Sequence, residues 1–176
     1  METYESFVEK CVKFHGHNCP GLLIGVKAAM YALEIFGEQF SEDEELVCVS
    51  ENDACGVDAI QVILGCSVGK GNLLMKLRGK QAFSFYDRKS GKSVRMVLKP
   101  LGNMTMKEKS AYLNQTPPAE LFDLTEAGPM PEKAKIFHSV RCEICGEETA
   151  EYFTRNQDGK VVCFDCFKPY TRFTLN

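Results

Sequence analysis

The chain has 176 residues, of which 44% are hydrophobic and 26% are charged, and its formal net charge is −3. These values are typical of a globular protein with one ordinary domain and a small appendage, and they exclude the strongly basic surface of a general nucleic-acid binder. The most apolar stretch, residues 21–36, is shorter than the roughly 20 residues of a membrane span, and the N-terminus is acidic, unlike a signal peptide, so we expect a soluble cytoplasmic protein with no membrane partner.

Three helices are predicted in the first part of the chain. Apolar residues recur at helical spacing over residues 4–14, 22–36 and 53–64. Pro20 suits the first position of the second helix, and Gly37 suits the position just past its end. The first two helices are therefore separated by a short irregular loop.

A sheet and two further helices are expected next. Short apolar runs predict strands over residues 46–50, 73–77, 81–86 and 93–99. Thr105 and Glu108 have the spacing of a capping box, which predicts a helix over 105–113, and a second short helix should start after Thr116. Helices mixed with strands rich in hairpins favour the α+β class.

The domain boundary is expected where glycine and proline gather. Residues 126–133 contain Gly128, Pro129 and Pro131, which disfavour both helix and sheet. We therefore predict an α+β core domain over residues 1–126, a linker over 127–139 and a small C-terminal domain over 140–176.

Cysteine use points to metal binding in the small domain. The chain has nine cysteines, an odd number, and shows no export signal, which favours metal ligands or reactive thiols over a disulfide framework. Cys142 and Cys145 form one C-x₂-C pair, and Cys163 and Cys166 form a second one 17 residues later. This is the spacing of a zinc ribbon.

The geometry of such a ribbon explains the spacing. Each tight turn supplies two thiolates for two corners of a tetrahedron, and a hairpin turn at residues 156–159 brings the two pairs together. Because four protein ligands leave no position for a substrate, the predicted zinc is structural.

A second candidate site lies near the N-terminus. His15, His17 and Cys19 fall within five residues, and imidazole and thiolate are good ligands for zinc and similar transition metals. Cys19 would cap a helix, which makes it either a metal ligand or a reactive thiol. Cys55 stands near the start of another helix, with Asp58 one turn later. If the two helix starts converge, His17, Cys19 and Cys55 share one metal with a free coordination position; otherwise they are packed loop residues and small buried thiols.

Three motifs resemble the FmdE family, which is named for a component of formylmethanofuran dehydrogenase. In chain order they are FHGHNCPG (residues 14–21), DACGVDAIQ (53–61) and GCSVGKGNL (65–73). With the strands behind them they cover about residues 1–100. The C-terminal cysteine pairs are similar to the zinc finger that some members carry.

The resemblance implies an α+β core that forms a homodimer, with a metal or active-site pocket built from the His-x-His-x-Cys loop and the Cys55 region. The catalytic candidates are Cys19, His17, Cys55 and Asp58. The candidate ligands of a second transition metal, expected to be zinc, are His17, Cys19, Cys55 and His15. The family name implies a complex that reduces CO₂ onto methanofuran with a molybdenum or tungsten pterin and iron–sulfur clusters, and no motif in this chain is typical of a site for those cofactors.

Three functions stay open at this point. The first is a metal-binding accessory subunit, or a free-standing relative, associated with a molybdenum or tungsten oxidoreductase. The second is a stand-alone enzyme that acts on a small molecule with a metal-bound water or a reactive Cys19. The third is a regulator whose zinc ribbon binds protein or nucleic acid, although the ribbon's mixed charge disfavours nucleic acid.

Overall fold

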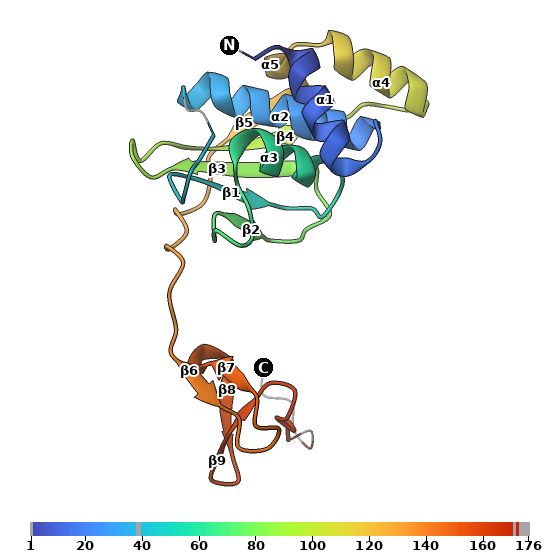
Figure 1. Ribbon diagram of the computed structural model, residues 1–176. Helices are drawn as coiled ribbons and strands as arrows, with labels where there is room; N and C mark the ends of the chain where they lie inside the picture. The colour runs from blue at the N-terminus through green and yellow to red at the C-terminus, as the bar shows by residue number, and fades with distance from the viewer. Residues whose placement is uncertain (1, 38–39, 171, 173–176) are drawn as a thin grey trace. The chain divides into compact units, whose positions relative to one another are not determined.

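The computed structural model describes residues 2–37, 40–170 and 172 (Figure 1). The chain divides into two compact units, and the boundary between them along the chain falls between Ala134 and Lys135. This division lies inside the segment 127–139 that the sequence predicts as a linker. None of the described helices is long and apolar enough to cross a membrane.

The first unit contains helices of which three begin at a side-chain cap. The helices are Tyr4–His15 (α1), Pro20–Phe36 (α2), Gly56–Leu64 (α3), Met106–Gln115 (α4) and Pro118–Leu121 (α5), and the three with such a cap are α1, α2 and α4. The Thr3 side chain accepts a hydrogen bond from the backbone of Ser6 at the start of α1, and Cys19 caps α2. The predicted capping box of Thr105 and Glu108 is present at the start of α4.

One five-stranded sheet completes the first unit. Its strands are Leu46–Ser50 (β1), Leu73–Met75 (β2), Ala82–Asp87 (β3), Ser93–Leu98 (β4) and Phe122–Thr125 (β5), in the order β2-β1-β3-β4-β5. Only the β1–β2 pair is parallel. Helix α3 lies between these two strands in sequence and makes the crossover that parallel strands require. The combination of one helical layer and this mixed sheet confirms the α+β class.

The main core lies between the sheet and the helices, which cover one face of the sheet (Figure 1). Alternate residues of β1 divide between the two faces: Leu46 and Cys48 join the main core, whereas Val47 and Val49 join a smaller cluster with Tyr86. Both faces of β3 are therefore covered, and all six of its residues are buried.

The second face of the sheet is covered by the chain that follows β5. Ala127 packs with Val47 and Tyr86. The Arg88 guanidinium donates hydrogen bonds to the carbonyl oxygens of Pro131 (2.9 Å) and Glu132 (3.0 Å). Residues 127–134 are thus attached to the first unit by packing and hydrogen bonds.

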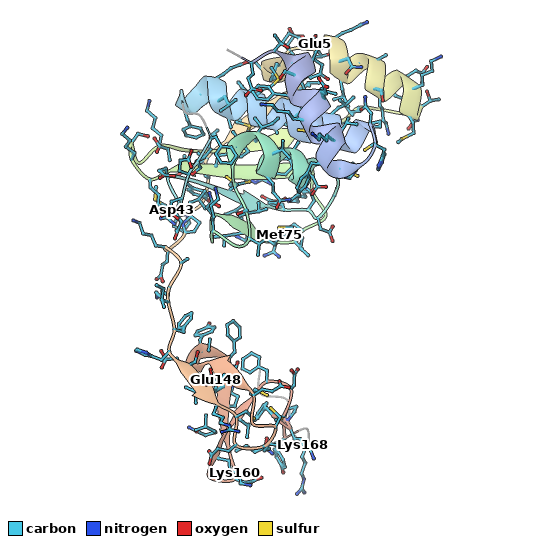
Figure 2. The ribbon with its side chains drawn as sticks, in the orientation of Figure 1. Glu5, Asp43, Met75, Glu148, Lys160 and Lys168 are labelled. Atoms are coloured by element: carbon cyan, nitrogen blue, oxygen red, sulfur yellow. The ribbon has the colours of Figure 1, made fainter. Side chains whose placement is uncertain are left out.

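The second unit consists of two small hairpins. Strands Ser139–Arg141 (β6) and Glu148–Ala150 (β7) pair antiparallel, as do Thr154–Gln157 (β8) and Lys160–Cys163 (β9). Asp158 and Gly159, with φ angles of 51° and 77°, form the tight turn of the second hairpin, which the sequence predicts. Glu148 of β7, Lys160 of β9 and Lys168 mark this unit in Figure 2.

Three strands are absent from the sequence prediction, namely β5, β6 and β7. Each has only three or four residues, and most of their side chains are exposed or half-buried. A run this short shows too little hydrophobic alternation to be distinguished from a loop.

Candidate metal centres

The four cysteines of the second unit form a preorganised tetrahedral site. The sulfur atoms of Cys142, Cys145, Cys163 and Cys166 all lie within 4.8 Å of one another. Cys145 Sγ and Cys163 Sγ are 3.9 Å apart. Four bonds of 2.3 Å to a tetrahedral zinc place sulfur atoms about 3.8 Å apart, so the cage has the size of a zinc thiolate centre.

The backbone around this cage favours thiolate. Amide groups of Cys145, Cys163 and Ile144 donate hydrogen bonds to the Cys142 sulfur and lower the pKa of that thiol to about 6. Burial and the neighbouring thiols instead raise the pKa of Cys166 to about 12. A bound dication would offset the cost of holding several thiolates close together, because it stabilises all four thiolates at once.

The N-terminal candidate is built from the loop between α1 and α2. Helix α1 ends at His15, and Gly16 takes a left-handed conformation (φ 95°) that reverses the chain. His17 follows, and Cys19 caps α2, where its sulfur accepts a hydrogen bond from the backbone of Leu22 (3.4 Å). Ligand atoms of His15, His17 and Cys19 lie within 4.8 Å of one another. The loop thus brings three metal-ligating groups together on adjoining turns.

Asp58 of α3 orients His15 from across the fold. His15 Nδ1 lies 2.7 Å from Asp58 Oδ2, and Gln61 Nε2 donates to the other carboxylate oxygen at 3.2 Å. With the proton on Nδ1, the lone pair of His15 is on Nε2, and this atom is buried without a hydrogen-bond partner among the residues that the structure describes. A carboxylate on one ring nitrogen and a free lone pair on the other is the arrangement of a metal-ligating histidine.

Cys55 lies beside Cys19 but outside the group of three. A Cβ atom built on Gly21 would be 3.5 Å from Cys55 Sγ and 3.8 Å from Cys19 Sγ, so both thiols border this glycine. The pKa of the Cys55 thiol is raised mainly by burial and, to a smaller extent, by a hydrogen bond with Cys19. A single ion shared by His17, Cys19 and Cys55 stays a prediction.

Gly25 and Gly56 allow the starts of α2 and α3 to converge. A Cβ atom on Gly25 of α2 would lie only 2.1 Å from the backbone oxygen of Gly56 in α3. The helices therefore cross in backbone contact, which places Cys19 near Cys55. Gly21 and Gly25, spaced one helical turn apart, are the sequence signal for this contact, which is absent from the sequence prediction. The hydrogen bond from Gln61 that supports Asp58 is also absent from that prediction.

The remaining cysteines of the first unit belong to the core. Cys11, Cys48 and Cys66 are fully buried, and the Cys66 thiol donates to the Leu46 carbonyl oxygen (3.5 Å). Burial raises the pKa of Cys66 to about 12. These thiols are inert packing groups.

The geometry predicts that Asp58→Asn weakens metal binding at the N-terminal site by about 10-fold to 100-fold, because the ring of His15 loses its anionic partner. The measurement is a chelator competition with zinc in a Cys142→Ser/Cys145→Ser background, which removes the ribbon site. Asp53→Asn makes the same chemical change at an exposed position nearby and should leave the affinity unchanged. Equal affinities for the two variants would contradict this role for Asp58.

Comparisons with known protein families identify both parts of the chain. Residues 14–144 match the model of the FmdE family, described as "Molybdenum formylmethanofuran dehydrogenase operon". Residues 135–172 match the prokaryotic dksA/traR C4-type zinc finger. The second match covers all four cysteines of the ribbon and supports a structural zinc there.

Two individual proteins are also similar. The crystal structure of a tungsten formylmethanofuran dehydrogenase FmdE-like protein from Syntrophus aciditrophicus has a TM-score of 0.73 and 26% identity, and the likeness covers 94% of this chain and 92% of that one. A probable S-adenosyl-L-methionine-binding protein of Archaeoglobus fulgidus is 30% identical over an alignment of 193 positions, which covers 90% of this chain and 51% of the relative. This chain therefore spans about half the length of that relative.

Proposed function

This chain belongs to the FmdE family, and we propose that it is a metal-binding accessory protein that holds a second transition metal beside its structural zinc. The proposed ligands are His15, His17 and Cys19, with Cys55 adjacent, and the proposed metal is zinc. The observation that carries the proposal is the buried Nε2 atom of His15, which has no hydrogen-bond partner in the described part of the chain while Asp58 holds the opposite nitrogen. A buried lone pair without a partner is costly, and a metal ion removes that cost.

The accessory role is supported by the family and by the donor sets. In the part of the chain that the structure describes, two groups unite three or more metal-ligating side chains, and these are the ribbon and the His15 loop. Both sets suit zinc. As an accessory protein, the chain would work with a molybdenum or tungsten formylmethanofuran dehydrogenase. Purification under gentle conditions from the native host should recover such a partner, and recovery of the protein alone would count against it.

Solvent access to the N-terminal site favours a stand-alone enzyme as the second candidate. His17 is exposed and Cys19 is half-buried, so the loop reaches solvent. A metal with three protein ligands supplies a Lewis acid with one free coordination position. The residues of the chain would keep the His15 proton on Nδ1 and hold both thiols against Gly21. The catalytic roles of Cys19, His17, Cys55 and Asp58, and the formation of a homodimer, stay predictions.

Metal counting tests the proposal. We expect two zinc ions per wild-type chain and one in the Cys142→Ser/Cys145→Ser variant. We also expect one in a His15→Ala/Cys19→Ser variant, because the ribbon keeps its own ion. Asp53→Asn serves as the control and should keep two. A wild-type protein that holds one zinc, lost only with the ribbon ligands, would overturn the second site.

A further inference from the structure

A groove of about 450 Å³ lies next to the proposed metal site. One side is formed by the first turn of α2, with Gly21 and Ile24, and the other by the segment from the end of β4 into α4, with Leu101 and Met106. This volume is in the range of sites that bind small molecules.

Gly21 connects the groove to the thiols. It lines the groove, and a side chain at its position would contact Cys55 Cβ at 3.3 Å and Cys19 Sγ at 3.8 Å. A molecule that lies along α2 therefore has one end next to the two thiols. Gly21 is therefore the residue at which the groove adjoins the two thiols.

The charge of the groove is positive. Lys99 and Lys109 line it, and no aspartate or glutamate among the described residues does. Lys99 Nζ donates to the Glu120 carbonyl oxygen (3.1 Å) and lies 3.8 Å from an Asp123 carboxylate that is 64% exposed. A long ion pair on the surface is weak, so this ammonium stays available to an anion. Lys109 adds a second ammonium on the α4 side of the groove.

Most of the remaining lining is apolar. Ile24 is buried, Leu98 and Leu101 are half-buried, and Met106 is 63% exposed. An exposed methionine at the edge of a groove is a flexible apolar contact for a ligand. Gln81 also lines the groove, and its side-chain oxygen is buried without a hydrogen-bond partner among the described residues.

We propose that this groove binds a small organic anion with an apolar body. Its carboxylate or phosphate group pairs with Lys99 and Lys109, its body packs on Ile24 and Met106, and its other end lies beside Gly21 at the metal site. This inference rests on the proposed function, because it names the ligand class of the same site.

The experiment uses the zinc-loaded full chain and the fluorescent anion 1-anilinonaphthalene-8-sulfonate as the probe. We expect Lys99→Gln/Lys109→Gln to weaken binding of this probe by about tenfold or more, since two charge-assisted contacts are lost. The control is Lys76→Gln/Lys107→Gln, which removes two lysines outside the groove and should bind as the wild type does. Equal binding by both double variants would overturn the proposal.

A second variant tests the groove independently of the folding of the lysine double variant. Met106 is the first residue of α4 and is exposed, so Met106→Glu places a carboxylate where a helix start favours it and where the groove should repel an anion. We expect weaker probe binding with an unchanged melting temperature. Unchanged probe binding would contradict the proposal.

Displacement of the probe identifies the anionic group. Phenyl phosphate should displace it if the groove takes phosphate esters, and benzoate should if it takes carboxylates, whereas benzyl alcohol should not. Failure of both anions would overturn the proposal. The Cys19→Ser variant separates the two claims, because it should lose the second metal and keep probe binding. Absence of a second metal from the wild-type chain defeats the proposed function, whereas absence of the lysine effect on probe binding defeats the groove.

Discussion

Gly25→Ala is expected to lower the free energy of unfolding of the first unit by about 3 kcal/mol or more. The added methyl group would lie 2.1 Å from the backbone oxygen of Gly56, and a backbone atom cannot turn aside as a side chain can. Helices α2 and α3 must therefore separate, and the shared core beneath them loses contacts. The measurement is chemical denaturation followed by circular dichroism.

Gly69→Ala is the matched control for this substitution. A Cβ atom at Gly69 meets nothing within 4 Å, and its φ angle is not positive, so the unfolding free energy should stay the same or rise slightly. The Gly25 variant should also bind the second metal more weakly, because α2, which Cys19 caps, would separate from α3, which carries the Asp58 partner of His15. Equal unfolding midpoints for the two variants would contradict the close crossing.

Removal of zinc from the ribbon is expected to unfold residues after about 138 while the first unit keeps its own transition. Among the described residues of this unit, the buried ones are Cys142, Val162 and Cys163, and two of these three belong to the four-cysteine cluster. The apolar core is therefore too small to be stable alone. Zinc binding is worth on the order of 10–16 kcal/mol in small zinc-finger peptides, which is enough to decide whether such a unit folds.

The variant that tests this is Cys142→Ser, observed by amide NMR signals from β6 to β9. We expect these signals to collapse into the unfolded range and about one zinc per chain to be lost. Asp165→Ser changes an exposed residue between two ligands and should keep both the signals and the zinc. A Cys142→Ser ribbon that stays folded with full zinc would show that the metal does not hold it together.

The ribbon could be predicted from the sequence because its information is local. Two C-x₂-C pairs fix four ligands, and the Asp158-Gly159 turn fixes the hairpin between them. The caps of α2 and α4 are local in the same way, and both are present where the sequence places them. Short-range steric and hydrogen-bonding rules are sufficient for such features.

The contacts that complete the N-terminal site are not local. His15 and Asp58 are 43 residues apart and meet only because α1 and α3 pack together. The spacing of His15, His17 and Cys19 shows which groups are available, whereas their tautomers and burial depend on the packing of three helices. The glycines at 21, 25 and 56 carry part of this information, since close helix contact requires residues without side chains.

The predicted linker is a second feature for which contacts distant in sequence could not be predicted. Glycine and proline in residues 126–133 indicate an irregular backbone, which the structure has. Irregular backbone can still be held in place, and here Arg88 and Glu44, far earlier in the chain, bind residues 131–134. Composition cannot reveal such partners, because they are distant in sequence.

The second metal site is tested most directly by anomalous diffraction at the zinc absorption edge from crystals of the zinc-loaded chain. We predict two peaks per chain, one among the four ribbon sulfurs and one at the N-terminal loop. The second should lie about 2.0–2.1 Å from His15 Nε2 and a His17 nitrogen and about 2.3 Å from Cys19 Sγ. A single peak at the ribbon, with His15 Nε2 bonded to a protein group or a water molecule, would contradict the proposed second metal.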